Sequence, residues 1–217
     1  MNIAPTLFFS TLETLYMVIA ACAISVFIGL PLGTYLFIQT TDLFGKRNRL
    51  GRIIGFIVNI VRSIPFIILM VAALPLTRWV VGTGIGTTAA IVPLSLAAAA
   101  FYTRVTESAL KACSVGLIEA SLSLGASTKQ IIFYVLLPEC RADLLRGATL
   151  MIIALIGYSA MAGAIGGGGL GSLAIQYGYQ RFDTQVMVAT IVILVLLVQC
   201  FQWIGSKLSE KYNREKA

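Results

Sequence analysis

Histidine is absent from this chain of 217 residues, and its four cysteines are scattered without a C-x-x-C pair. These absences exclude the usual zinc and haem ligand spacings and leave no disulfide framework to expect. A phosphate-binding loop, G-x-x-x-x-G-K followed by Ser or Thr, is also missing. The chain is therefore not expected to hydrolyse ATP by itself. No Lys or Arg precedes Lys46, so the first apolar run lacks the basic start of a cleavable signal and should remain in the mature protein.

Charge is also scarce, because only 12% of the residues are charged while 58% are hydrophobic, and the mean hydropathy is +0.91. A soluble domain would have about twice that charge and roughly 45–50% apolar residues. A larger core cannot account for the excess, since a chain of this size still needs a polar surface in water. The composition therefore predicts an all-α integral membrane protein.

Long apolar runs predict five membrane-spanning helices within a single domain, residues 1–217. A helix needs about 20 apolar residues to cross a hydrocarbon core of about 30 Å. The predicted spans cover residues 15–38, 53–77, 88–109, 147–165 and 184–206. Gly29, Pro31 and Gly33 interrupt the first run and predict a kink there.

Basic residues predict the orientation of the spans. Thirteen of the sixteen Lys and Arg residues belong to the first loop between spans, to the segment 104–146 or to the C-terminal tail. Positive residues stay in the cytoplasm, so the N-terminus is expected outside and the C-terminus inside. The same sorting explains the net charge of +7. Nucleic-acid binding also predicts a basic chain, but not charges that sort by loop, so no nucleic-acid partner is expected.

The one long polar stretch, residues 110–146, lies on the predicted cytoplasmic side. Gly125 can supply a left-handed cap for one short helix. Ser127 with Gln130 forms a capping-box pattern for a second, and Pro138 can only begin a new turn. The pattern predicts helix, turn and helix between two spans.

Two interpretations of this stretch compete, a DNA-reading motif and an amphipathic docking element for a cytoplasmic partner. The stretch is too short for a third helix and a core of its own, which favours docking. The apolar residues expected to face the membrane domain are Ile131, Ile132, Val135 and Leu136.

The same stretch resembles the cytoplasmic signature of ABC importer permeases, Glu-Ala-Ala, three residues, Gly, nine residues, Ile, one residue, Leu-Pro. The positions that match are Glu119, Ala120, Gly125, Leu137 and Pro138. Two positions depart mildly, since Ser121 replaces the second Ala and Val135 replaces the Ile. The resemblance implies that this loop is the coupling helix, which docks on an ATP-hydrolysing subunit.

A wider resemblance, over about residues 10–205, is to the methionine-importer permeases. It is carried by R-S-I-P-F at 62–66, G-I-G at 84–86 with A-I-V-P-L at 90–94, G-Y-S-A-M at 157–161 and Q-Y-G-Y at 176–179. The resemblance implies a homodimer in a bacterial cell membrane, the inner one where there are two. It also implies two ATP-binding subunits that hold ATP and Mg on the cytoplasmic side, and an extracytoplasmic methionine-binding protein.

Four residues are candidates for the translocation pathway. Arg62 falls roughly 14 Å into its predicted span by helical rise, so it either faces protein or water in the membrane or extends to the headgroups. Met161 is either a packing residue or, because this segment lines the central pathway in the resembled family, a gate on the dimer axis. Tyr158 and Ser159 are candidates for the same lining.

Two other classes of function compete with the permease. A secondary transporter would need ion-coupling carboxylates at midspan, yet no Asp or Glu lies deep in a predicted span, and only Glu13 and Glu107 lie near span ends. A membrane scaffold is compatible with the fold class alone. A co-purifying ATPase distinguishes the permease from both.

The predicted orientation can be tested with single cysteines in a chain whose four native cysteines are replaced by Ala. A membrane-impermeant thiol reagent applied to intact cells should label Thr87→Cys and spare Asn48→Cys, because the first position is predicted outside and the second inside. Permeabilised cells, in which both should react, are the control. The opposite pattern would overturn the orientation and the coupling assignment with it.

Overall fold

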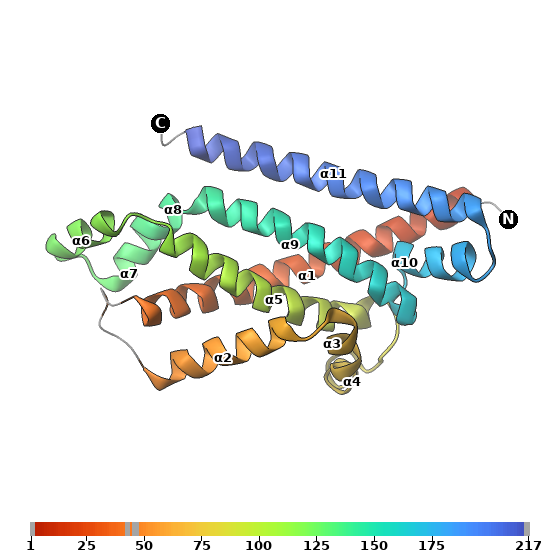
Figure 1. Cartoon of the computed structure of the whole chain (residues 1–217), viewed down its shortest axis with the longest axis horizontal. Coiled ribbons are helices and arrows are strands. Elements are labelled where there is room, and N and C mark those ends of the chain that lie inside the picture. Colours follow the sequence, from red (N-terminus) through yellow and green to blue (C-terminus); the bar gives the residue numbers. More distant parts are fainter. Residues whose placement is uncertain (1–2, 42–43, 45–47, 215–217) are drawn as a thin grey trace.

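The computed structural model describes residues 3–41, 44 and 48–214, and every regular element among them is helical (Figure 1). Lys46, Arg47 and Lys216, which belong to the basic sorting described above, lie outside these residues. Within the described residues, four helices are long and apolar enough to cross a membrane, and the number is five if a bent pair of shorter helices forms one span. The four long helices are α1 (Ile3–Thr40), α5 (Thr87–Lys111), α9 (Arg141–Ala162) and α11 (Thr184–Arg214).

Helix α1 is one continuous helix that begins twelve residues before the predicted span and passes through Pro31 without ending. Its glycines serve close packing instead of an interruption. A Cβ placed on Gly33 would lie 2.5 Å from the Thr103 carbonyl oxygen and the Thr106 Cβ, so only glycine lets α1 lie this close to α5. The expected break in the first run is therefore replaced by a helix–helix contact.

The predicted second span, 53–77, is not one helix. Helix α2 (Arg49–Ser63) ends before Ile64, which is extended, and α3 (Phe66–Ala72) then leaves at a bend of 111°. A short helix, α4 (Leu74–Val81), follows. The cause is local, since a residue before proline disfavours the helical conformation and Pro65 has no N–H to donate. The run 53–77 is apolar as predicted, but the prediction that it forms one continuous helix is wrong.

The last two spans also differ from their predicted bounds, 147–165 at both ends and 184–206 at its C-terminal end. Helix α9 begins at Arg141, so the final residues of the predicted cytoplasmic stretch 110–146 already belong to it. The segment Gly163–Gly167 follows, in which the backbone leaves the helical conformation at Ile165 and Gly166, and α10 (Gly169–Leu173) comes after it. Helix α11 begins at Thr184 as predicted but extends eight residues beyond the predicted end.

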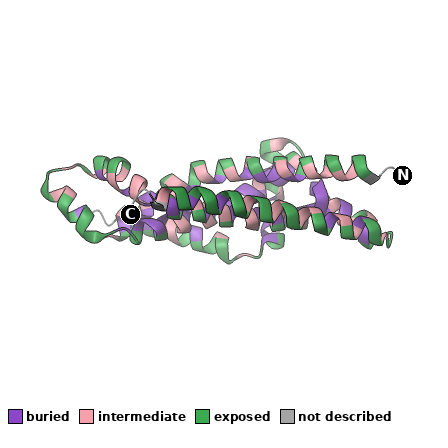
Figure 2. Ribbon diagram, turned by 90° about the horizontal axis from the view of Figure 1, so that it is seen from above, coloured by how far each residue is buried: buried purple, intermediate pink, exposed green. Residues whose placement is uncertain are grey.

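The core is built around α5, which packs against α1, α2 and α9. Its centre is formed by fully buried apolar side chains such as Met17, Leu94 and Leu155. Helix α11 packs on α9 but leaves most of its own surface exposed (Figure 2). Large apolar side chains also lie exposed on α1 and α2, for example Phe27 and Phe56. A surface of this kind is suited to lipid and to protein partners, as expected of a multi-pass membrane protein.

A cluster of charges joins three helices at the end of α5. Glu107, which is only 4% exposed, is paired with Arg104 and accepts a hydrogen bond of 2.7 Å from Lys111. Arg104 also donates to the carbonyl oxygen of Gly55 on α2 at 2.7 Å. The hydroxyl of Thr40, at the end of α1, lies 3.5 Å from the Glu107 carboxylate. Glu107 and its partner Arg104 therefore fasten α1 and α2 to α5.

Glu107→Gln should lower the stability of the detergent-solubilised protein by roughly 3 kcal/mol, because it leaves Arg104 partly buried without its counter-charge. The measurement is the midpoint of thermal unfolding. Asp143→Asn is the matched control, since it breaks the exposed pair between Asp143 and Arg146, which is worth less than about 1 kcal/mol. Equal midpoints for the two variants would show that the cluster does not hold the helices together.

Candidate functional site

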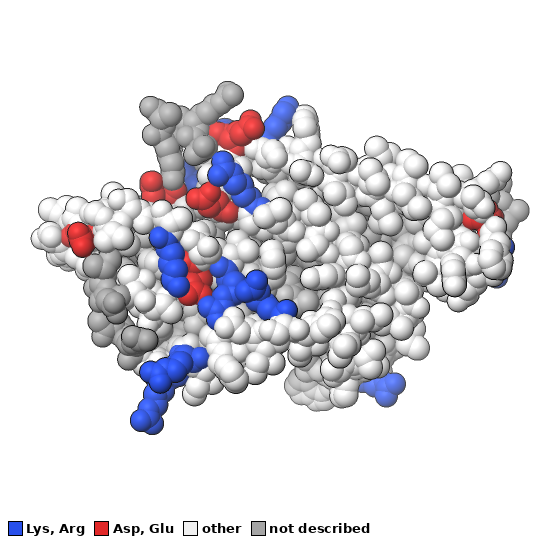
Figure 3. Space-filling view, in the orientation of Figure 1, with Lys and Arg blue, Asp and Glu red and all other residues white. Residues whose placement is uncertain are grey.

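The polar segment between α5 and α9 forms a small helical unit at one end of the molecule (Figure 1). It contains α6 (Val115–Ser123), a turn, α7 (Thr128–Gln130), a π-helical segment (Ile131–Leu136) and α8 (Leu137–Glu139). Many of the Lys and Arg side chains gather toward this end in the space-filling view (Figure 3). The predicted helix, turn and helix are confirmed.

The turn has the local chemistry that its residues predict. Gly125 has a φ of +80°, the left-handed conformation expected of a helix cap. Ser127 and Gln130 form the complete capping box, in which the Ser127 N–H donates to the Gln130 side chain at 2.8 Å. A Cβ on Gly125 would meet nothing within 4 Å in this chain. The glycine is therefore required for its backbone conformation, and the space beside it is open.

The inner face of this unit is anchored to the ends of α1 and α5. Ile118, Ile131 and Leu136 are buried in one cluster with Phe37 of α1 and Leu110 of α5. The other two residues predicted to face inward, Ile132 and Val135, are half-buried and pack against the same cluster. The predicted orientation of the amphipathic segment is therefore borne out, and the unit is packed directly on α1 and α5.

The outer face exposes apolar and aromatic side chains around a shallow groove of about 370 Å³. Leu124 is 88% exposed and Tyr134 is 80% exposed, and both line the groove together with Gly125 and Gln130. Phe133 is exposed beside them. Large exposed apolar groups on a polar segment mark a protein-binding surface. Sequence reasoning missed Leu124, Phe133 and Tyr134, although two adjacent aromatics outside the apolar stripe of a short amphipathic helix were a usable signal.

The five signature residues do not form one cluster. Glu119 and Ala120 lie exposed on α6, and neither lines the groove, whereas Gly125 does. Leu137 and Pro138 are half-buried and begin α8, which leads through Cys140 into α9. The structure thus places the first three at the exposed surface and the last two where the unit joins the long helix.

The four pathway candidates are also separated. Met161 lies exposed on α9, in line with Leu150 and Gly157. Tyr158 is turned aside and stacks on Phe66, with ring centroids 4.6 Å apart.

Ser159 is 1% exposed and donates to the Ile156 carbonyl oxygen, so it faces the core of the chain and offers no lining surface in this conformation. Arg62 is exposed in the last turn of α2, next to the bend at Pro65.

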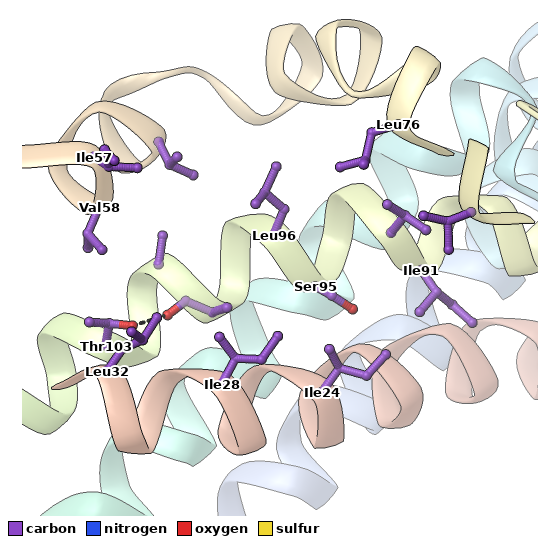
Figure 4. Close-up of a pocket in the computed structure, with 15 residues that line it drawn as sticks. Ile24, Ile28, Leu32, Ile57, Val58, Leu76, Ile91, Ser95, Leu96 and Thr103 are labelled. Atoms are coloured by element: carbon purple, nitrogen blue, oxygen red, sulfur yellow. Dashed lines mark hydrogen bonds between the residues drawn. The ribbon is translucent and has the colours of Figure 1, made fainter. Parts of the chain in front are cut away.

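An apolar cavity of about 410 Å³ lies between α1, α2, α4 and α5 (Figure 4). Ile24 and Ile28 line one side, Ile57 and Leu76 the other, and no charged side chain lines it. Such a cavity can accept hydrocarbon. It offers nothing to an ammonium or a carboxylate, whose burial without a partner is very costly.

Comparison with known proteins gives one consistent family. Residues 25–214 match the family model described as binding-protein-dependent transport system inner membrane component. The chain is 48% identical over 204 residues to the probable D-methionine transport system permease protein MetI of Vibrio cholerae, covering 94% of this chain and 91% of that protein. It is 41% identical over 200 residues to the methionine import system permease protein MetP of Bacillus subtilis, covering 92% and 90%.

Solved structures agree with the sequence comparisons. A chain from the inward-facing MetNI methionine ABC transporter superimposes with a TM-score of 0.93 at 44% identity, covering 95% of this chain and 96% of that one. A chain from an amino acid ABC transporter with histidines superimposes with a TM-score of 0.80 at 18% identity, which shows likeness of fold alone.

Ile131→Ala should loosen the helical unit, because deleting the buried part of an aliphatic side chain typically costs about 2–5 kcal/mol. The measurement is hydrogen exchange of the amides in residues 115–139 in the detergent-solubilised protein, which should become faster. Tyr134→Ala, at an exposed position three residues later, is the control and should leave exchange unchanged. Equal protection in both variants would mean that the buried cluster does not anchor the unit.

Proposed function

The chain belongs to the family of binding-protein-dependent transport system inner membrane components, and on this premise we propose that it is the permease subunit of an ATP-driven importer of methionine. The cargo is supported by relatives that cover more than nine-tenths of the chain and whose names specify methionine. Methionine of either hand fits these names.

The proposed assembly is a homodimer of this chain with two ATP-binding subunits below it and an extracytoplasmic methionine-binding protein above it. ATP and Mg would be held by the ATP-binding subunits, since this sequence contains no phosphate-binding loop. In the proposed orientation, the N-terminus is outside and the C-terminus is cytoplasmic. The exposed apolar surfaces of α1, α2 and α11 leave ample room for both a second copy and lipid.

The observation that carries the proposal is the exposed groove around Gly125 on a unit whose opposite face is buried against α1 and α5. We propose that the ATP-binding subunit docks on this groove and that Glu119 lies near the rim of the contact. Movement of the docked subunit would reach α9 directly, because α8 is followed at once by α9. At its other end, α9 presents Met161, the proposed gate on the dimer axis. Arg62, at the bend between α2 and α3, is a second candidate for the pathway surface.

The carboxylates near the predicted span ends give little support to the alternative, an ion-coupled secondary transporter. Glu107 is held by Arg104 and Lys111 at the end of α5, and the Glu13 carboxylate accepts a hydrogen bond from the Gly169 N–H. Both acids are engaged in contacts that hold helices of this chain together. The two functions make opposite predictions for uptake in vesicles that contain no ATP.

Gly125→Asp should leave membrane abundance near normal while association with the ATP-binding subunit and methionine uptake both fall. The φ of +80° costs a residue with a Cβ roughly 1 kcal/mol or more. A charge desolvated without a match at the docked face would add several kcal/mol, enough for a loss of about tenfold or more. The measurements are co-purification of the ATP-binding subunit and uptake of labelled methionine. Glu119→Lys should act in the same direction but more weakly.

Gly116→Asp is the matched control, because Gly116 is exposed on the same helix α6 but does not line the groove. It should associate and transport normally. Normal uptake by Gly125→Asp at normal abundance would mean that the groove is not the coupling surface. Uptake by the unaltered chain without ATP would contradict the importer itself.

A further inference from the structure

A second cavity, of about 340 Å³, lies between α9 and α11 toward the end of the bundle that carries the coupling segment. Unlike the cavity of Figure 4, it is lined by charges of both signs, Arg146 from α9 and Glu210 from α11. Ser206 adds a hydroxyl, and Leu150 and Ile153 form an apolar stretch on the α9 side. Polar and apolar groups therefore lie at opposite ends of the α9 wall.

The walls of this cavity are held in place by two contacts between the helices. Gly205 of α11 lies so close to Thr149 of α9 that a Cβ there would be 2.0 Å from the Thr149 hydroxyl. Four residues later, the buried Ser209 hydroxyl donates to the Ala142 carbonyl oxygen at 3.1 Å. A groove whose two walls are joined in this way keeps its shape when the helices move together.

The charged groups retain capacity for a ligand. One nitrogen of the Arg146 guanidinium is 3.1 Å from Asp143, and a guanidinium has five N–H donors in a fork that suits a carboxylate. Glu210 is exposed on the opposite wall and can accept from an ammonium group. A zwitterionic amino acid carries an ammonium and a carboxylate on one carbon. Its carboxylate could pair with Arg146 and its ammonium with Glu210, so each charge would have a counterpart.

We propose that this cavity is a transient binding site for the transported amino acid on the cytoplasmic side of the pathway. Arg146 binds the α-carboxylate, Glu210 binds the α-ammonium, and the thioether side chain lies along Leu150 and Ile153. This inference rests on the proposed function, because it assigns a subsite to the methionine that the importer would carry.

The position of the cavity on α9 agrees with such a site. Arg146, Leu150 and Ile153 lie on the same face of α9 as Gly157 and Met161, since their spacings of three and four residues repeat with the helical turn. Fifteen residues separate Arg146 from Met161, about 22 Å by helical rise. An amino acid that had passed the proposed gate would reach the cavity by moving along this one face.

The test measures binding of labelled methionine to the purified complex of this chain with its ATP-binding subunit, without the binding protein, and competition by two analogues. Methionine methyl ester lacks the carboxylate, and 4-methylthiobutanoate lacks the ammonium. Both analogues should compete poorly with labelled methionine for binding to the unaltered complex.

Arg146→Gln should weaken methionine binding by about tenfold, the value of a charge-assisted contact, and abolish the discrimination against the ester. Glu210→Gln should weaken it similarly and abolish the discrimination against the acid. The control is Lys207→Gln, which removes a charge from the same helix at a residue that faces the Trp203 ring instead of the cavity.

The same preparations are reconstituted for uptake, so that the outcomes can be separated. If the unaltered complex imports methionine but both variants bind and discriminate as it does, the subsite is wrong and the importer stands. If the variants no longer form a dimer of this chain while methionine binding is unchanged, the cavity belongs to the interface between the two copies, and the proposed subsite is again wrong. Failure of the unaltered complex to import methionine would overturn the proposed function itself.

Discussion

Hydrocarbon offers no hydrogen-bond partner to a peptide group, so every interruption of a helix in this chain must find its partners within the protein. The glycine-rich turn after α9 shows how this is done. The N–H of Gly169, which begins α10, donates to the Glu13 carboxylate at 2.7 Å, and the next N–H donates to the Thr14 hydroxyl at 2.9 Å. Both acceptors belong to α1. The N-terminal part of α1 thus caps a helix that follows 156 residues later, which explains the length of α1 beyond a single crossing.

Contacts between helices also connect the two ends of the molecule, from the helical unit between α5 and α9 to the glycine-rich turn after α9. The helical unit between α5 and α9 is anchored on α1 and α5 by a buried apolar cluster, and Arg104, paired with Glu107, fastens α5 to α2. Helix α9 begins directly after the unit and extends to the glycine turn that α1 caps. A displacement at the groove around Gly125 therefore reaches the far end through packed helices, with no flexible linker between the unit and α9.

Features encoded by neighbouring residues could be predicted from the sequence, and features that depend on distant contacts could not. The left-handed Gly125 and the capping box of Ser127 and Gln130 each depend on a few adjacent residues. The break at Pro65 was also local, but the apolar composition of the run hid it. The burial of Ser159 depends on how α9 is rotated against the core, and the cavity between α9 and α11 joins residues more than sixty positions apart. No local pattern contains either fact.

The charged lining of the cavity between α9 and α11 agrees with its place near the C-terminal end of α11. Helix α11 has 31 residues, about 46 Å by helical rise, which exceeds a hydrocarbon core of about 30 Å. Glu210, near its end, can therefore lie level with the headgroups, where a charge keeps much of its hydration and midspan costs do not apply. Bound charges that remain partly hydrated attract one another only modestly. The proposed subsite would therefore bind an amino acid weakly enough to release it, as the inner end of an import pathway requires.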